Sequence, residues 1–431
     1  MNKQLLIING RVIDPASKTD EQMDVCVAGD RIAWISECGR KETSDQISAG
    51  DNLKVIDASG KIVVPGLIDC HVHFREPGFE SKETIYSGSR AAVMGGFTSV
   101  ICEPNTSPPI DNIEMVDSLM AMARNGSVAH LYTKVCMTKS SFGKERTDIT
   151  SLALHDYVLA LSDDGNPIID KAVVRSVFLK AKESNIPVSP HCEDSPQAIL
   201  QKQNRDIFTN PPYTNEAAFI ERDIECAEES GVQLHISHIS LKESVGLIRE
   251  AKRRNRTKIT CEVTPHHLTM DNGFMDVDGL VPKVCPPLRS REDVVALRDG
   301  LADGTIDVIA SDHAPHTLND KKNGAFGLIG LETALGIIIT EIVKKGVLSW
   351  SDAIQKMTYN PSHIFSINAG QLAVGMPADI TIIDPDVNWI VEPEHFESRS
   401  RNCPFQNMGL QGKAYAVIVD GAIVMMGGNI C

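Results

Sequence analysis

The stretch of sequence that decides the fold begins at residue 66 and reads Gly66-Leu67-Ile68-Asp69-Cys70-His71-Val72-His73. It is a hydrophobic segment that ends in two histidines two positions apart, and the pattern predicts a β-strand. Successive side chains of a strand point to opposite faces, so His71 and His73 share a face and converge on one point. A lone histidine in an apolar run is usually a core residue, but two at this spacing, followed by a charged cluster, indicate half of a metal site.

Outward from this stretch, apolar strands alternate with longer amphipathic helices. We expect helices at 173–183, 215–230 and 241–255, among others. The expected strands are 61–69, 98–102, 130–136, 158–162, 187–191, 233–238, 258–263 and 307–311. Eight strands with crossover helices over about 300 residues predict an α/β fold, a parallel (β/α)8 barrel of the TIM type.

Both ends of the chain have a different pattern, with short strands, turn residues and no strong helix before about residue 62. The β character returns near residues 378–383 and 416–419, after the last helical region. We therefore expect residues 1–62 and 370–431 to form one small β-sandwich module beside a barrel at 63–369.

Composition excludes several classes of partner. The 431-residue chain has a net charge of −15, and an acidic protein repels nucleic acids and anionic membranes. No segment approaches the roughly 18 apolar residues of a membrane span, and the start of the chain lacks the features of a signal peptide. Eleven cysteines without CxxC pairs favour reduced thiols, so we expect a cytoplasmic protein that binds a small molecule.

Polar residues end five of the expected strands, and in a barrel the carboxyl ends of the strands face the mouth where catalysis occurs. An aspartate at a strand end is often a helix cap or turn former, so Asp163 and Asp164 are ambiguous when taken singly. Six ligands exceed what one catalytic zinc needs, whereas two metal ions bridged by a carboxylate and a hydroxide would use all six. The strand-end residues are His71, His73, Asp163, Asp164, His191, His238 and Asp312.

The residues around these strand ends resemble the dihydroorotases of the amidohydrolase superfamily, of the long, class I type. The resemblance covers nearly the whole chain in the family's order and implies the reversible cyclisation of N-carbamoyl-L-aspartate to L-dihydroorotate in pyrimidine (UMP) biosynthesis. The motifs that carry it lie at 65–69, 71–78, 95–98, 104–106, 163–165, 191–194, 238–240, 262–268, 286–289, 311–316 and 375–379.

The resemblance also implies roles for the strand-end residues. His71, His73 and Asp312 match the ligands of a first metal ion, and His191 and His238 match those of a second. Asp164, next to Gly165, matches the bridging ligand, with Asp163 as the fallback. We expect two Zn²⁺ per chain, a metal-bridged hydroxide as nucleophile, and Asp312 as the general acid and base.

Substrate contacts follow from the same resemblance and include Arg75, whose guanidinium fork suits a carboxylate. Cys285 stands where the family usually has asparagine, Glu103 replaces a usual methionine, and Ala325 replaces a common proline. The thiol of Cys285 is a poor substitute for an amide, so one substrate contact is expected to weaken. The expected substrate-binding residues are Arg75, Asn105, Cys285, His316, Phe326 and Gly327.

Two alternatives stay open. One is another cyclic-amide hydrolase, such as an allantoinase or hydantoinase, although many of these carry a carboxylated lysine where this chain has the aspartate pair. The other is a noncatalytic dihydroorotase-like subunit of aspartate carbamoyltransferase, although such relatives typically lose metal histidines. We expect a homodimer and consider association with aspartate carbamoyltransferase. His235, three residues before His238, is expected to point to the opposite strand face and pack in the core.

Overall fold

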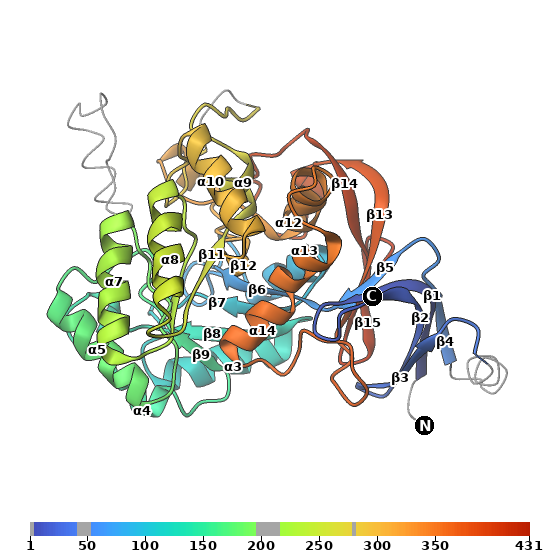
Figure 1. Cartoon of the computed structure of the whole chain (residues 1–431), viewed down its shortest axis with the longest axis horizontal. Helices are drawn as coiled ribbons and strands as arrows, with labels where there is room; N and C mark the ends of the chain where they lie inside the picture. Colours follow the sequence, from blue (N-terminus) through green and yellow to red (C-terminus); the bar gives the residue numbers. More distant parts are fainter. Residues whose placement is uncertain (1–3, 41–52, 195–215, 278–281) are drawn as a thin grey trace.

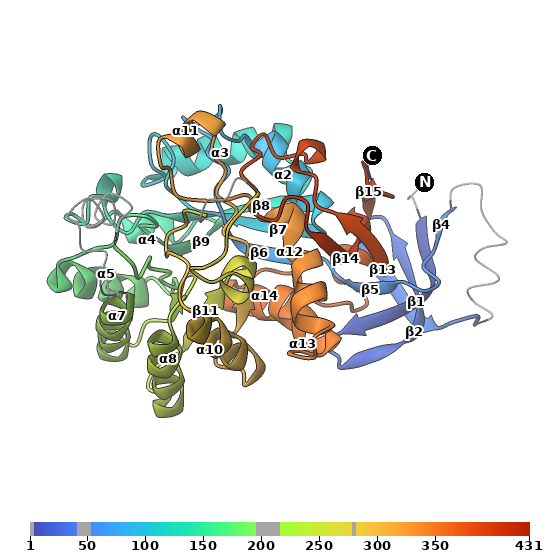
Figure 2. The same ribbon diagram turned by 90° about the horizontal axis from the view of Figure 1, so that it is seen from above.

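The structure, a computed structural model, describes residues 4–40, 53–194, 216–277 and 282–431. A barrel with helices around it lies beside a smaller β module, which contains the strands from both ends of the chain (Figure 1). Figure 2 shows the same arrangement from above, with α5, α7 and α8 at the end of the molecule away from the module. None of the helices in the described ranges is long and apolar enough to cross a membrane.

The barrel strands occupy the positions that the sequence pattern predicts. Two parallel sheets of four and three strands are joined through Val188, which bridges Leu161 and Leu234, and through a bridge between Val72 and His313. This arrangement agrees with the predicted α/β barrel. The strands are β6 Leu67–Val72, β7 Phe97–Cys102, β8 His130–Val135, β9 Val158–Leu161, β10 Leu234–Ile236, β11 Ile259–Val263 and β12 Val308–Ile309.

The fifth predicted strand, 187–191, is shorter than expected. Only Val188 pairs with its neighbours in the structure. Pro187 and Pro190 flank it, and proline lacks the N–H group that a central strand must donate. The alternating pattern therefore located the strand correctly but overestimated its length.

The helices cover the outside of the barrel, and local side chains set their ends. Asp170 caps α5, because its carboxylate accepts a hydrogen bond from the N–H of Ala172, while Asn255 ends α8 in a left-handed conformation. The helix predicted over 215–230 begins at Glu216, residue 215 lying outside the described ranges. The helices are α2 Ile85–Met94, α3 Ile113–Gly126, α4 Ile149–Leu152, α5 Lys171–Glu183, α7 Glu216–Ser230, α8 Lys242–Arg254, α9 Pro265–Thr269, α10 Arg291–Ala302, α11 Leu318–Lys322, α12 Leu331–Ile337, α13 Trp350–Met357 and α14 Tyr359–Phe365, with shorter turns η1 Lys139–Ser141, η2 Ile338–Val343 and η3 Pro393–His395.

The module is built on a nine-stranded sheet that takes strands from both ends of the chain. Its central strand β5 pairs in parallel with β1 and antiparallel with β13, so it joins the two ends. The sheet encloses an apolar cluster that includes Ile7, Val63 and Ile382. The strands are β1 Gln4–Asp14, β2 Thr19–Ala28, β3 Arg31–Glu37, β4 Leu53–Asp57, β5 Ile62–Pro65, β13 Ile380–Ile390, β14 Gly409–Val419, β15 Ala422–Met426 and β16 Asn429–Ile430.

Gly66 separates the module from the barrel. The strand predicted over 61–69 is interrupted there, because β5 belongs to the module and β6 to the barrel. A Cβ atom at Gly66 would lie 2.1 Å from Oγ1 of Thr98, so only glycine allows the chain to pass between the two sheets. We propose the predicted division into a module of residues 1–62 and 370–431 and a barrel of residues 63–369, with the first boundary moved to Gly66 because β5 pairs within the module sheet.

Candidate metal centre

Four buried histidines at the ends of barrel strands gather around Asp164 and Asp312. One oxygen of Asp164, Oδ1, lies 3.1 Å from Nδ1 of His191 and 3.2 Å from Nε2 of His238. These two nitrogens are themselves 3.1 Å apart. Nε2 of His73 lies 3.1 Å from Oδ1 of Asp312. Imidazole nitrogens and carboxylate oxygens therefore face one another across a small volume.

The two aspartates that follow β9 have different partners. Asp163 accepts hydrogen bonds from the N–H groups of Met137 and Thr138, at 2.8 and 3.3 Å, and from the Thr138 hydroxyl. Its carboxylate thus holds the loop after β8. Asp164 alone reaches the histidines, which agrees with the preference for Asp164 over Asp163 as the bridging ligand.

The backbone is strained at three of the predicted site residues. Arg75, His238 and Asp312 have φ values of 63°, 30° and 47°, in the left-handed region that non-glycine residues avoid. Each such residue costs about 1–3 kcal/mol and persists only where its surroundings impose it, often at functional sites. At His238 the chain turns directly after β10, and this turn directs the ring toward Asp164.

Electrostatics keep both aspartates ionised. Burial would raise the pKa of Asp164, but hydrogen bonds from His191 and His238 hold that pKa well below its usual value. Burial likewise opposes ionisation of Asp312, and the hydrogen bond to His73 lowers the pKa of Asp312. Both groups are therefore carboxylates at neutral pH, as metal ligands and proton acceptors must be.

The donor atoms fit divalent metal ions. Two groups of three donors each have all their ligand atoms within 4.8 Å of one another. These groups are His71, Asp164 and His238, and His71, His73 and Asp312. Nε2 of His71, shared by both groups, is buried and has no hydrogen-bond partner in the described part of the chain. A buried imidazole nitrogen without a partner is costly, and a bound cation would satisfy it.

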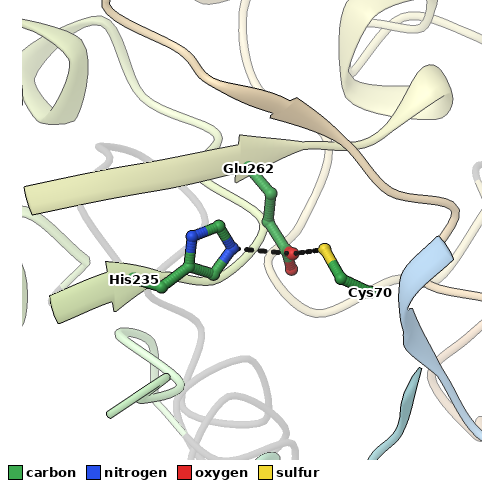
Figure 3. A group of neighbouring side chains, drawn as sticks. All are labelled: Cys70, His235 and Glu262. Carbon is green, nitrogen blue, oxygen red and sulfur yellow. Dashed lines mark hydrogen bonds and ion pairs between the residues drawn. The ribbon is translucent and has the colours of Figure 1, made fainter. Parts of the chain in front are cut away.

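Glu262 fixes the orientation of His71 from beneath. Its Oε1 lies 2.5 Å from Nδ1 of His71, so Nδ1 carries the proton and Nε2 faces the metal centre. Its Oε2 accepts from Sγ of Cys70 at 2.9 Å and lies 3.1 Å from Nε2 of His235 (Figure 3). The three side chains come from β6, β10 and β11, and both oxygens of Glu262 are used. We interpret this group as a hydrogen-bonded support for His71.

Glu262 lies within a motif of the resemblance, but the sequence analysis assigned it no role. The signal that could have identified it is a carboxylate inside an otherwise apolar strand. His235 is buried in the core as predicted, with its ring edge-on against Phe365, and it also contacts Glu262. Strand alternation does not relate His235 to His238 because β10 ends at Ile236.

Asn105 performs for His73 the role that Glu262 performs for His71. Nδ1 of His73 donates to Oδ1 of Asn105 at 2.9 Å, which leaves Nε2 directed at Asp312. The amide nitrogen of Asn105 donates to Oδ2 of Asp164 at 3.1 Å. The predicted substrate residue thus lies between two of the predicted metal ligands.

A positively charged region lies beside this centre, on loops instead of strands. Arg75 is partly buried, donates through Nε to the carbonyl of Pro315 at 3.2 Å, and places Nη2 3.3 Å from Nε2 of His316. His316 donates to the carbonyl of Phe326 at 2.7 Å, and its Nδ1 accepts from Lys82 at 3.3 Å. Burial and the nearby cations lower the pKa of His316 to about 2, so the ring is neutral at physiological pH.

Gly327 allows this loop to pack closely. Its φ is 130°, and a Cβ there would lie 2.7 Å from the carbonyl oxygen of Ala314 and 3.2 Å from the His316 ring. The predicted substrate residues Phe326 and Gly327 therefore lie directly against His316. Cys285 lies elsewhere, with Sγ 3.6 Å from Nε2 of His191 and donating to the carbonyl of Asp194 at 3.4 Å. The thiol thus contacts a predicted metal ligand.

Comparison with known proteins identifies the family to which the chain belongs. The Amidohydrolase family matches residues 62–424. A dihydroorotase of Pelotomaculum thermopropionicum is 44% identical over 433 aligned residues, covering 98% of each chain, and one of Pelobacter propionicus is 40% identical over 431, covering 97% of this chain and 99% of its own. The chain belongs to the dihydroorotases of the amidohydrolase family. This is a metal-dependent family, in agreement with the donor geometry.

Solved structures agree with the fold. The L-hydantoinase (dihydropyrimidinase) of Arthrobacter aurescens has a TM-score of 0.88 and 24% identity, covering 100% of this chain and 98% of that chain. The dihydropyrimidinase of Brevibacillus agri NCHU1002 has a TM-score of 0.86 and 23% identity, covering 99% and 96%. At this identity, the likeness concerns the barrel and module architecture that dihydroorotases share with these enzymes.

Proposed function

We propose that this chain is an active dihydroorotase that interconverts N-carbamoyl-L-aspartate and L-dihydroorotate in de novo pyrimidine biosynthesis. The observation that carries the proposal is the 44% identity to a dihydroorotase over 98% of both chains. The convergence of four buried histidines with Asp164 and Asp312 supports it, because a chain kept only as a scaffold has no need of such a donor set.

We infer that two Zn²⁺ ions bind at this centre. His71, His73 and Asp312 would hold the first ion, His191 and His238 the second, with Asp164 as the bridging ligand. Support comes from Asp164, whose Oδ1 is near both His191 and His238 and 3.6 Å from Nε2 of His71. When bound, the ions supply Lewis acidity that makes hydroxide available near neutral pH and polarises the amide carbonyl.

Asp312 moves the proton. Its carboxylate accepts a proton from the nucleophile during ring opening and delivers it to the ring nitrogen that leaves. In the cyclisation direction the same carboxylate works as acid and base in the opposite order. The lowered pKa of Asp312 keeps it ionised between turnovers, although burial opposes that ionisation, and its hydrogen bond to His73 holds it in place.

The positive region receives the substrate carboxylate. Arg75 provides the guanidinium fork, and neutral His316 and the Phe326–Gly327 segment form the adjacent wall. Asn105 orients His73 and Asp164 and lies at the same edge of the centre. We propose that Cys285 contacts the substrate, because it occupies the position of a substrate-binding asparagine in the family. Its contact with His191 also links it to the metal centre.

Partners and cell compartment remain predictions. We expect a homodimer in the cytoplasm, with association with aspartate carbamoyltransferase as a further prediction. The alternative substrate class, hydantoin or allantoin, is favoured only by the shared architecture of the hydantoinases.

The test is an assay of purified, zinc-loaded protein with dihydroorotate, hydantoin and allantoin, together with elemental analysis. We expect turnover of dihydroorotate alone and close to two zinc ions per chain, with one lost in His191→Ala. Efficient cleavage of hydantoin or allantoin without dihydroorotate turnover would refute the substrate assignment. Full turnover by metal-free protein would refute the mechanism.

A further inference from the structure

Glu103 is a third carboxylate beside His71. It follows β7, and its N–H donates to the carbonyl of Val72 at 2.9 Å, which places it level with the end of β6. Oε1 of Glu103 lies 3.6 Å from Nε2 of His71. The oxygens of Asp164 and Asp312 lie 3.6 and 3.8 Å from the same nitrogen. Glu103 is thus as near to His71 as Asp164 is, although it joins neither of the three-residue donor groups described above.

Lys134 holds this carboxylate in the barrel interior. Both side chains are fully buried, and Nζ of Lys134 forms an ion pair with Oε1 of Glu103 and donates to Oγ of Ser189 at 3.0 Å. The other oxygen of Glu103, Oε2, has no hydrogen-bond partner among the described residues. A carboxylate oxygen left without a partner in a protein interior is expensive unless a cation is near.

Two buried carboxylates and one buried lysine lie around His71. Lys134 is one buried cation, and it faces two buried carboxylates, Glu103 and Glu262. Glu262 is satisfied by its hydrogen bonds to His71 and His235. Glu103 therefore places a carboxylate next to Nε2 of His71, the nitrogen that has no hydrogen-bond partner in the described chain.

We propose that Glu103, oriented by Lys134, supplies a further carboxylate oxygen to the metal ion that His71 holds. The inference rests on the proposed metal centre and adds a residue to it. Carboxylate oxygens are ordinary zinc ligands, and a negative group beside the ion strengthens its binding. Lys134 is a positioning residue, because it acts through Glu103 and leaves the second carboxylate oxygen unoccupied.

The decisive variant is the double substitution Glu103→Met with Lys134→Met. It replaces the buried ion pair by two apolar side chains of similar length, a change that leaves stability nearly constant when the pair is only structural. Glu103→Gln is the second variant, since it removes the charge but keeps the shape. Asp24→Asn is the matched control, because Asp24 is a buried carboxylate of the module that accepts from the N–H of Asn9.

The measurements are Zn²⁺ affinity by competition with a chelator and the melting temperature of the metal-free protein. We expect the double variant to melt within a few degrees of the parent yet to bind zinc about 10–100-fold more weakly, with Glu103→Gln also weakened. Asp24→Asn should keep the parent affinity. Variants at Glu103 that bind zinc within threefold of the parent overturn this inference and show a purely structural ion pair.

The parent protein in the same titration separates the two proposals. A parent that binds no divalent ion and turns over no dihydroorotate overturns the proposed function, and this inference with it. A parent that binds zinc and is active, with unchanged affinity in the Glu103 variants, overturns only the role of Glu103.

Discussion

The metal centre and the arginine side of the site, which consists of Arg75, Lys82, His316 and the Phe326–Gly327 segment, are built in different ways. The metal centre uses buried residues at strand ends, and two of its histidines, His71 and His73, are oriented by Glu262 and Asn105. The arginine side uses loops, and Arg75 is only partly buried. The carboxylates and histidines of the metal centre are thus separated from Arg75 and Lys82 within one barrel mouth.

The difference teaches how one site can bind ligands of opposite charge. The metal centre is suited to cations and to the charge that develops during reaction, whereas the arginine side is suited to a carboxylate that does not react. Substitutions on the metal centre should therefore change kcat or metal content, and those on the arginine side should change KM. The predictions below test that separation, beginning with the largest effect.

The largest loss is expected for Asp312→Asn. An amide can still coordinate a metal ion through its oxygen but cannot carry a proton, so kcat should fall about 10²–10⁴-fold in both directions. Zinc content and KM should stay close to those of the parent. Elemental analysis and steady-state kinetics check this, and a kcat within about tenfold of the parent would mean that another group moves the proton.

The next largest loss is expected for Glu262→Gln. The amide can still accept from His71, but its NH2 group must then face Cys70 and His235, which disturbs the support shown in Figure 3. Zinc affinity should fall about 10-fold or more, by the usual cost of losing a residue that orients a metal ligand. Chelator competition measures it, and Asp24→Asn is again the control. An unchanged zinc affinity would mean that a residue other than Glu262 orients His71.

Arg75→Lys should affect the arginine side of the site and therefore substrate binding. A lysine is a point charge and cannot reproduce the planar fork, so KM for dihydroorotate should rise about tenfold while kcat and zinc content stay near parent values. Arg175→Lys, at an exposed pair with Glu229, is the control. A fall in kcat equal to the rise in KM would show that the arginine side and the metal centre do not act independently.

Cys285→Asn should have the smallest effect and tests where the two sides meet. If this residue faces substrate, the restored amide should lower KM a few-fold and leave zinc content unchanged. The thiol also lies 3.6 Å from Nε2 of His191. Loss of the second zinc ion in this variant would instead assign Cys285 to the metal centre.

The sequence predicted the parts that depend on strand register. His71 and His73 share a face because their spacing matches the strand period, and the strand-end positions of His191, His238 and Asp312 follow from the barrel pattern. These features require only local periodicity and one topology rule. The order of the barrel strands was predictable for the same reason.

Features that depend on three or more strands were not predictable. Glu103, Lys134 and Ser189 come from separate parts of the chain and meet only because the barrel brings them together. The contact between His235 and Glu262 was not predicted, because it joins two strands that only the barrel brings together. The preference for Asp164 came from the resemblance, whereas the contact of Asp163 with Thr138 in the loop after β8 was not predicted.

The position of β5 has a consequence for synthesis of the chain. β5 lies between β1 and β13, yet its partner Ile380 follows Pro65 by about 315 residues. At roughly 5–20 residues per second, a ribosome needs about 15–60 seconds to deliver β13 after β5 has been made. During that time one edge of an apolar strand has no partner, and such edges invite association between chains. Slow translation or high expression should therefore favour aggregation through the module before the barrel is complete.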